Sequence, residues 1–247
     1  MAHDELIPAG LRARLKDLRL LARRASGTCG FGWHRSRDRG AGLEFAQYRA
    51  YEPGDEPRQI DWKLYARSDR FFVREAERES PLTLWLLVDA SASMQQADAS
   101  QPGWTRLAAA RCLAACAIEL ALRQGDRFGM IAVGADALCS VVPAASGVRQ
   151  RDRCLLELQR LQPRGGWPGE VRLRPIWDLI APGALALFLS DGFDPTAIDL
   201  VTRLARARRE LLSVQILTAE ERDFPYTGNR RFVDPETAVE LSSDGAD

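Results

Sequence analysis

The chain has 247 residues, of which 46% are hydrophobic, enough for a substantial core in one elaborated domain or two small ones. Its 34 basic and 34 acidic residues give a formal net charge of zero, which excludes a general electrostatic attraction to nucleic acid or to an anionic membrane. No stretch approaches the roughly 20 apolar residues of a membrane span, and residues 1–5 lack the features of a signal peptide. We therefore expect a cytoplasmic protein.

The amino-terminal part is basic and has leucines at helical spacing. Residues 6–25 are predicted to form an amphipathic helix, with arginines on its solvated face. Contact between these arginines and an acidic partner or a membrane surface stays an open alternative. Residues 26–42, rich in glycine and arginine, are predicted to be a loop.

A small β-rich subdomain is predicted next, over residues 43–80. Aromatic and β-branched positions are broken there by turn sequences such as Pro53-Gly54-Asp55. Together with the helix, this subdomain makes up a predicted first domain of residues 1–81.

From residue 83 the pattern alternates between strand and helix, which predicts an α/β fold with a doubly wound, mostly parallel sheet. A hairpin turn is expected at 134–136 and a loop at 163–169. We assign residues 82–220 to this domain and 221–247 to a polar extension with one strand at 231–234. The predicted strands are 83–89, 127–134, 138–142, 184–190 and 212–218, and the predicted helices are 105–124, 148–161, 174–181 and 196–210.

Oxygen-bearing side chains follow two of the buried strands. Asp89, Ser91 and Ser93 come at the end of the first strand, and Asp191 follows the strand 184–190. An aspartate after a strand is often only a helix cap. Two such motifs at the carboxyl edge of one sheet instead favour a shared site for Mg2+, or for Mn2+, which accepts the same ligands.

The order of Asp-x-Ser-x-Ser-Met at 89–94, residues 125–131 and Leu-Ser-Asp-Gly at 189–192 resembles the von Willebrand factor A domain with its metal-ion-dependent adhesion site. The resemblance implies a binding module in which Asp89, Ser91, Ser93 and Asp191 hold a metal that a partner's carboxylate completes. The family's second-loop threonine has no match, because residues 162–178 contain neither Thr nor Ser. Glu170 is the nearest oxygen donor there.

Residues 49–62, with Ala66-Arg67 and residues 74–77, resemble the signature of the bacterial domain of unknown function family fifty-eight. The resemblance implies a partner of the MoxR type of AAA+ ATPase and an unidentified client protein. The charged residues could form a scaffolding network, which we favour, or contact the partner directly. The candidate partner-binding residues are Arg49, Asp55, Arg58, Asp61, Trp62 and Arg67.

Catalysis has little support in the sequence. Only two histidines are present, and no phosphate-binding loop occurs. We expect a non-catalytic, metal-dependent adaptor. The alternatives are a Mg2+-dependent phosphohydrolase that uses Asp89 and Asp191, and a structural domain with a vestigial metal site. The five scattered cysteines, without Cys-x-x-Cys, argue against a disulfide framework or a zinc knuckle.

Overall fold

The computed structural model describes residues 6–21, 45–52, 55, 57–76, 82–135 and 137–243. The chain divides into two compact units, residues 1–20 with 82–247, and residues 21–81. This division differs from the predicted one, because the amino-terminal helix and the carboxyl-terminal extension both belong to the larger unit. The predicted loop at 26–42 lies outside the described residues.

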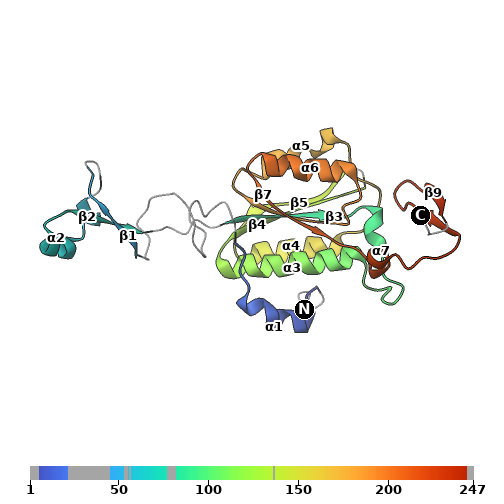
Figure 1. The fold of residues 1–247 in the computed structure, drawn as a ribbon, viewed down its shortest axis with the longest axis horizontal. Helices are drawn as coiled ribbons and strands as arrows, with labels where there is room; N and C mark the ends of the chain where they lie inside the picture. Colours follow the sequence, from blue (N-terminus) through green and yellow to red (C-terminus); the bar gives the residue numbers. More distant parts are fainter. Residues whose placement is uncertain are drawn as a thin grey trace. The chain divides into compact units, whose positions relative to one another are not determined.

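The larger unit is built on a five-stranded sheet with the order β5-β4-β3-β6-β7. Neighbouring strands are parallel except for the antiparallel pair β4–β5. Helices α3 and α4 cover one face of the sheet, and α5 and α6 cover the other (Figure 1). The strands are β3 Thr83–Asp89, β4 Arg127–Gly134, β5 Ala137–Ala145, β6 Leu185–Ser190 and β7 Glu210–Gln215, and the helices are α3 Arg106–Gln124, α4 Val148–Arg160, α5 Glu170–Leu179 and α6 Pro195–Arg206.

The core lies on both faces of the three central strands. Strands β3, β4 and β6 are near-continuous apolar runs because helices cover both faces, and almost all of their side chains are buried. On one face Trp85 and Leu87 of β3 pack in a cluster with Ile176 of α5 and Leu200 of α6. The predicted α/β class with a mostly parallel sheet is therefore confirmed.

Helix α3 begins and ends where its sequence provides caps. The side chain of Thr105 accepts a hydrogen bond from the backbone N–H of Ala108 (3.1 Å) at the amino end. Gly125 takes a left-handed conformation (φ 74°) at the carboxyl end, which costs glycine little. Both ends fall within one residue of the predicted bounds.

The edge strand β5 returns antiparallel to β4 through a tight turn, as the turn sequence predicted. Its register along β4 shifts twice, between Phe128 and Met130 and between Ala132 and Val133. Pro143 lies within this strand.

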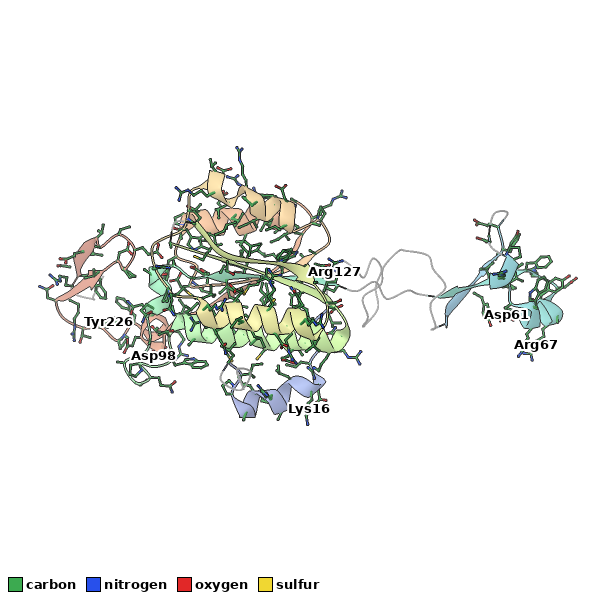
Figure 2. The ribbon with its side chains drawn as sticks, turned by 180° about the vertical axis from the view of Figure 1, so that it is seen from behind. Lys16, Asp61, Arg67, Asp98, Arg127 and Tyr226 are labelled. Atoms are coloured by element: carbon green, nitrogen blue, oxygen red, sulfur yellow. The ribbon has the colours of Figure 1, made fainter. Side chains whose placement is uncertain are left out.

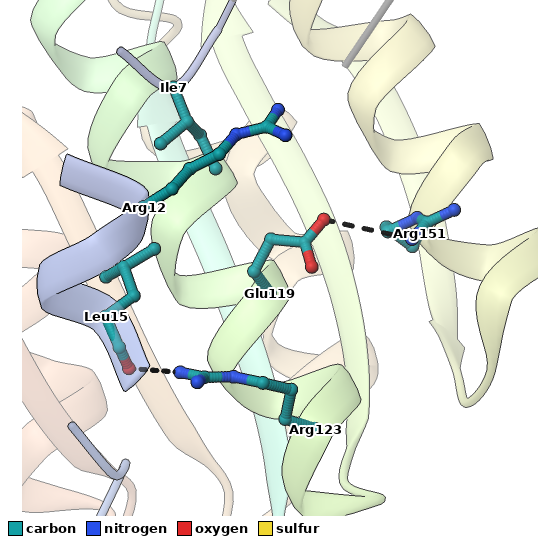
Figure 3. Close-up of a pocket in the computed structure, with 6 residues that line it drawn as sticks. All are labelled: Ile7, Arg12, Leu15, Glu119, Arg123 and Arg151. Carbon is teal, nitrogen blue, oxygen red and sulfur yellow. Dashed lines mark hydrogen bonds and ion pairs between the residues drawn. The ribbon is translucent and has the colours of Figure 1, made fainter. Parts of the chain in front are cut away.

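The amino-terminal helix is shorter than predicted. Helix α1 spans Ala9–Arg14, a 3-10 turn covers Leu15–Asp17, and Leu18 is already extended. The leucine spacing predicted a longer helix than is present, because after Asp17 the chain leaves the helical conformation and its backbone forms hydrogen bonds with side chains of α3. Arg123 of α3 donates to the carbonyls of Leu15 and of Lys16. Figure 3 shows the contact with Leu15. Residues 22–25 of the predicted helix lie outside the described part of the chain.

Residues 21–81 enter and leave the larger unit at the same end of α3. The side chain of Gln124 bonds both to the backbone N–H (2.7 Å) and to the carbonyl (3.0 Å) of Leu20. Two residues further, Asp126 accepts a hydrogen bond from the backbone N–H of Leu82 (2.8 Å). The smaller unit is thus an insertion with both ends fixed around the Gly125 turn.

The smaller unit contains an antiparallel pair of strands and one short helix. Strands β1 Phe45–Ala50 and β2 Phe72–Ala76 pair with each other, and short strands were predicted in this region. Helix α2 Trp62–Ser68 lies between these two strands in the sequence. The sequence reading missed α2, which has only seven residues. Tyr65 stacks on Phe71 with ring centroids 4.4 Å apart, and Trp62 meets both rings edge-on.

The carboxyl-terminal extension contains helix α7 Ala219–Asp223 and the strands β8 Arg230–Val233 and β9 Glu240–Ser243. The single strand predicted at 231–234 is therefore one arm of an antiparallel hairpin, which we term the C-terminal hairpin (residues 230–243). Asp98 holds α7 by accepting hydrogen bonds from the backbone N–H of Ala219 (2.7 Å) and of Glu220 (3.4 Å). Figure 2 shows Asp98 and Tyr226 at this end of the unit.

Among the described residues, no helix is long and apolar enough to cross a membrane.

Candidate metal and partner-binding site

The candidate site lies where the order of the sheet reverses. From β3 the chain proceeds to β4 on one side, and β6 later adds on the other side. Ligand sites of open α/β sheets form in the crevice at such a point, beyond the carboxyl ends of the strands. Asp89 ends β3, and Asp191 directly follows β6.

Asp89 is buried, with only 1% of its surface exposed. Its Oδ1 accepts a hydrogen bond from the backbone N–H of Ser91 (2.9 Å), and its Oδ2 accepts one from the hydroxyl of Ser190 (2.5 Å). Burial raises the pKa of the Asp89 carboxyl, and these hydrogen bonds only partly offset that effect. A cation beside Asp89 would stabilise the charge that burial disfavours.

The two serine hydroxyls of the same loop point to one place. The Oγ atoms of Ser91 and Ser93 form a hydrogen bond with each other (3.0 Å), and both residues are buried. Magnesium binds oxygens at about 2.0–2.1 Å in an octahedron, so that neighbouring ligand oxygens are about 3 Å apart. The separation of the hydroxyls fits two adjacent ligands of one ion.

Asp191 is also buried, and its charge is balanced by an arginine. Its Oδ1 accepts a hydrogen bond from the backbone N–H of Phe193 (3.2 Å), and its Oδ2 pairs with Nη1 of Arg106 (2.7 Å). The same Nη1 donates to the carbonyl of Ser93 (3.0 Å), and Nε donates to Glu221 of α7 (3.1 Å). Burial lowers the pKa of Arg106, while Asp191 and Asp89 raise it. A metal ion at Asp191 would therefore compete with a buried guanidinium.

The loop that lacks the expected threonine is fixed through its backbone. The N–H of Arg164 donates to the carbonyl of Ala90 (3.0 Å), and the N–H of Ala92 donates to the carbonyl of Gly165 (2.7 Å). Trp167 lies close enough to Asp89 to lower the pKa of its carboxyl. The buried indole Nε1 nevertheless has no hydrogen-bond partner within the part of the chain that the structure describes.

Glu170 is not a member of this site, and that prediction is corrected. It is the first residue of α5, its side chain is 69% exposed, and it pairs with Arg203 of α6 (2.5 Å). This ion pair lowers the pKa of Glu170. The helix begins at Glu170 and not at the predicted residue 174, so the side chain lies on a solvated helix surface.

A residue of the C-terminal hairpin takes the position near the hydroxyls. The carboxyl group of Glu236 lies close enough to the hydroxyls of Ser91 and Ser93 for them to lower its pKa. A cavity of about 760 Å3 beside this contact is lined by Ser93, Arg106 and Glu236, among others. Burial and the nearby charges of Asp89 and Asp191 raise the pKa of Glu236, although the hydroxyls lower it.

The oxygen atoms available at the site belong to carboxylates and hydroxyls, which are the ligands that a hard cation prefers. No group of three or more His, Cys, Asp or Glu side chains that could hold a metal ion occurs among the described residues. A metal ion at this place would draw on the serine hydroxyls as well as on the two aspartates. The residues present fit Mg2+ in chemistry, with Arg106 as a built-in competitor.

Sequence reasoning missed several residues of this site. Ser190 adjoins Asp191 and could have been found from the strand-end motif. Arg106, Trp167 and Glu236 come to the site only through the tertiary fold, and no local pattern marks them.

The candidate partner-binding residues lie in the smaller unit and divide by role. Asp61 is buried and caps α2 by accepting hydrogen bonds from the backbone N–H groups of Lys63 (2.9 Å) and Leu64 (3.0 Å). Its Oδ2 also accepts one from the hydroxyl of Tyr48 (2.9 Å). Asp55 closes a turn by accepting from the N–H of Glu52 (2.9 Å). These two aspartates therefore have structural roles.

The other candidates are at the surface or only partly described. Trp62 is 59% exposed, and Arg58 and Arg67 are exposed as well. Figure 2 shows Asp61 and Arg67 in this unit. The backbone of Arg49 belongs to β1, and its side chain lies outside what the structure describes.

Comparison with known proteins gave three findings. A family model described as "Protein of unknown function DUF58" matches residues 47–246. "Uncharacterized protein Mb1516" of Mycobacterium bovis and "Uncharacterized protein Rv1480" of Mycobacterium tuberculosis are each 30% identical over 253 residues, covering 100% of this chain and 78% of the relative. A solved chain, "Crystal Structure of Uncharacterized Membrane Spanning Protein from Vibrio fischeri", is 19% identical with a TM-score of 0.31, and the match covers 67% of this chain and 79% of that one.

Proposed function

This chain belongs to the DUF58 family of unknown function, and we propose that it is a non-catalytic adaptor that binds a partner protein through a metal site. Mg2+, or Mn2+ in its place, is held by Asp89, Ser91, Ser93 and Asp191. A carboxylate of the partner completes the coordination shell. The proposal includes no catalytic step by this chain.

One observation carries the proposal. Two buried hydroxyls lie 3.0 Å apart in the loop that follows β3, and buried aspartates stand at the carboxyl ends of the neighbouring strands β3 and β6. That spacing suits adjacent oxygens around Mg2+. The sheet order, with one antiparallel edge strand, is consistent with a von Willebrand factor A-like domain.

The nature of the partner rests on the resemblance of residues 49–62. That resemblance nominates a MoxR-type AAA+ ATPase as the motor and this chain as the adaptor toward a client complex. The exposed Trp62, Arg58 and Arg67 are available in the smaller unit for a contact that does not need the metal.

The metal part of the proposal is tested by thermal unfolding with Mg2+ or with EDTA. A ligand that binds only the native state raises the free energy of unfolding, by about 2.7 kcal/mol at a concentration one hundred times its Kd, and Tm rises with it. We expect a rise in the wild type and none in Asp89→Ala, with Asp199→Ala on the surface of α6 as the control. Equal curves in Mg2+ and EDTA for the wild type would contradict a metal site.

The partner is tested by affinity purification from the native host, in parallel with Mg2+ and with EDTA, and identification by mass spectrometry. We expect an AAA+ ATPase only in the Mg2+ sample. Recovery in both samples would place the interface in the smaller unit.

A second candidate is a structural domain whose metal site is vestigial. The observation that favours it is the ion pair between Arg106 and Asp191, which already supplies a cation to the site. The same unfolding experiment separates the two candidates, because the structural domain shows no response to Mg2+.

A further inference from the structure

The C-terminal hairpin presents one carboxylate to the candidate site. Glu236 lies in the turn between β8 and β9, and it lines the same cavity as Ser93 and Arg106, near enough to the hydroxyls of Ser91 and Ser93 for them to lower the pKa of its carboxyl group. These are the same hydroxyls that converge at 3.0 Å in the proposed metal site. A glutamate of the chain itself therefore lies beside the hydroxyls to which the proposed function assigns the metal and a partner's carboxylate.

The turn is built to hold Glu236 in this position. Oδ1 of Asp234 accepts the backbone N–H of Glu236 (2.9 Å), and Oδ2 accepts the hydroxyl of Thr237 (2.5 Å). The backbone closes the turn further, from the N–H of Ala238 to the carbonyl of Asp234 (2.8 Å). Such a turn holds Glu236, its third residue, in a defined backbone conformation.

The base of the hairpin is fixed to the same site. Phe224, Tyr226 and Phe232 pack together, with ring centroids 5.3 to 6.0 Å apart. Glu221 of the preceding helix α7 binds Arg106, which binds Asp191. The hairpin and the site are thus linked twice, through Arg106 and through Glu236.

The hairpin is also weakly held outside these contacts. Most residues of β8 and β9 are exposed, and each strand has only four residues. An isolated two-stranded hairpin has marginal stability, and segments with few buried contacts open at low cost. Opening would release Glu236 without disturbing the central sheet.

We propose that Glu236 is an internal ligand of the Asp89 site and that the C-terminal hairpin closes the site against acidic partners until it is displaced. The occupant that displaces it is a carboxylate-bearing segment of a protein partner. The competition rests on the proposed binding function, whereas the closure itself does not.

The closure is tested by hydrogen exchange on the full-length protein in EDTA. Glu236→Gln removes the charge, and Glu240→Gln makes the same change in β9, where the side chain is exposed and pairs with Arg231 (3.3 Å). We expect amides of residues 230–243 to exchange faster in Glu236→Gln than in the wild type, and at the wild-type rate in Glu240→Gln. Equal exchange in the two variants would overturn the proposal.

The competition is tested with a fluorescent cyclic peptide that copies residues 233–239, in the presence of Mg2+. If the open state is about 10% populated, the apparent affinity of the wild type is lowered about tenfold, and Glu236→Gln recovers it. Equal affinity of the wild type and Glu236→Gln would overturn internal competition. Closure in EDTA together with no Tm response to Mg2+ would count against the proposed function alone.

Discussion

At the scale of single residues, Asp89 is a buried carboxyl whose pKa is raised mainly by burial. A carboxyl with a folded pKa above its unfolded value destabilises the fold once it ionises, so stability is lost as the pH rises through the folded pKa. Without a metal, Asp89→Asn should therefore raise Tm at pH 8. A gain of about 1 kcal/mol would appear as roughly 2–4 °C in a chain of this size.

This pH dependence is measured by melting curves between pH 4 and pH 8 in EDTA. The difference between Asp89→Asn and the wild type should shrink as the pH falls through the folded pKa. Asp178→Asn, at an exposed position of α5, is the control. A lower Tm for Asp89→Asn at pH 8 would contradict the effect of burial.

The cysteines differ in reactivity because of their surroundings. Burial raises the pKa of Cys116 and of Cys154 to about 12, and it also raises the pKa of Cys139, which is nevertheless the exposed thiol of the three. Only the thiolate reacts, so at pH 8 the first two thiols should be nearly inert. In a Cys29→Ser background, a chromogenic disulfide reagent with peptide mapping should modify Cys139 first. Labelling of Cys154 at the same rate would show that α4 does not bury it.

At the scale of elements, the end of β4 approaches the Asp89 loop so closely that only glycine fits. A Cβ on Gly134 would lie 2.3 Å from the carbonyl oxygen of Ala90. Gly134→Ala should therefore displace the loop and cost about 1–3 kcal/mol, as overpacking does. It should also weaken any Mg2+ response. Gly169→Ala is the matched control, because its Cβ meets nothing within 4 Å and its φ is −60°.

Urea unfolding of the two glycine variants measures this effect. If Gly134→Ala unfolds at the same urea concentration as Gly169→Ala, the close approach of β4 to the loop is not present in solution.

The elements were predictable where one local rule dominated. Strands β3 and β4 match their predicted bounds, because a run of buried apolar residues is readable without knowing its neighbours. Helix α5 begins four residues before its predicted start, and Pro175 lies inside it. Strand β7 begins two residues and ends three residues before its predicted bounds, as its edge position leaves an irregular pattern of burial.

The candidate site was predictable only as far as it is local in sequence. Asp89, Ser91 and Ser93 share one loop, and Asp191 follows a strand that the topology brings alongside. Arg106 and Glu236 arrive from a helix start and from a polar extension, where an arginine or glutamate is ordinarily a solvated side chain. Their roles depend on packing that no spacing encodes.

At the scale of the whole molecule, residues 21–81 form an insertion whose ends are fixed beside Gly125. An insertion whose two ends are anchored side by side can be replaced by a short linker with little loss in the stability of the larger unit. Replacing residues 22–81 with a short Gly-Ser linker should therefore leave the larger unit folded, with its Mg2+ response intact. Circular dichroism and the melting experiment in Mg2+ and EDTA measure this, and loss of the fold would show that the insertion supports it.

The antiparallel strand β5 has a consequence for how copies of this protein meet one another. An unpaired sheet edge is a template on which a second chain can add, and shifts of register or a proline spoil that template. Strand β5 has both, with two register shifts and Pro143. We therefore expect the β5 edge to resist the addition of a strand from a second molecule.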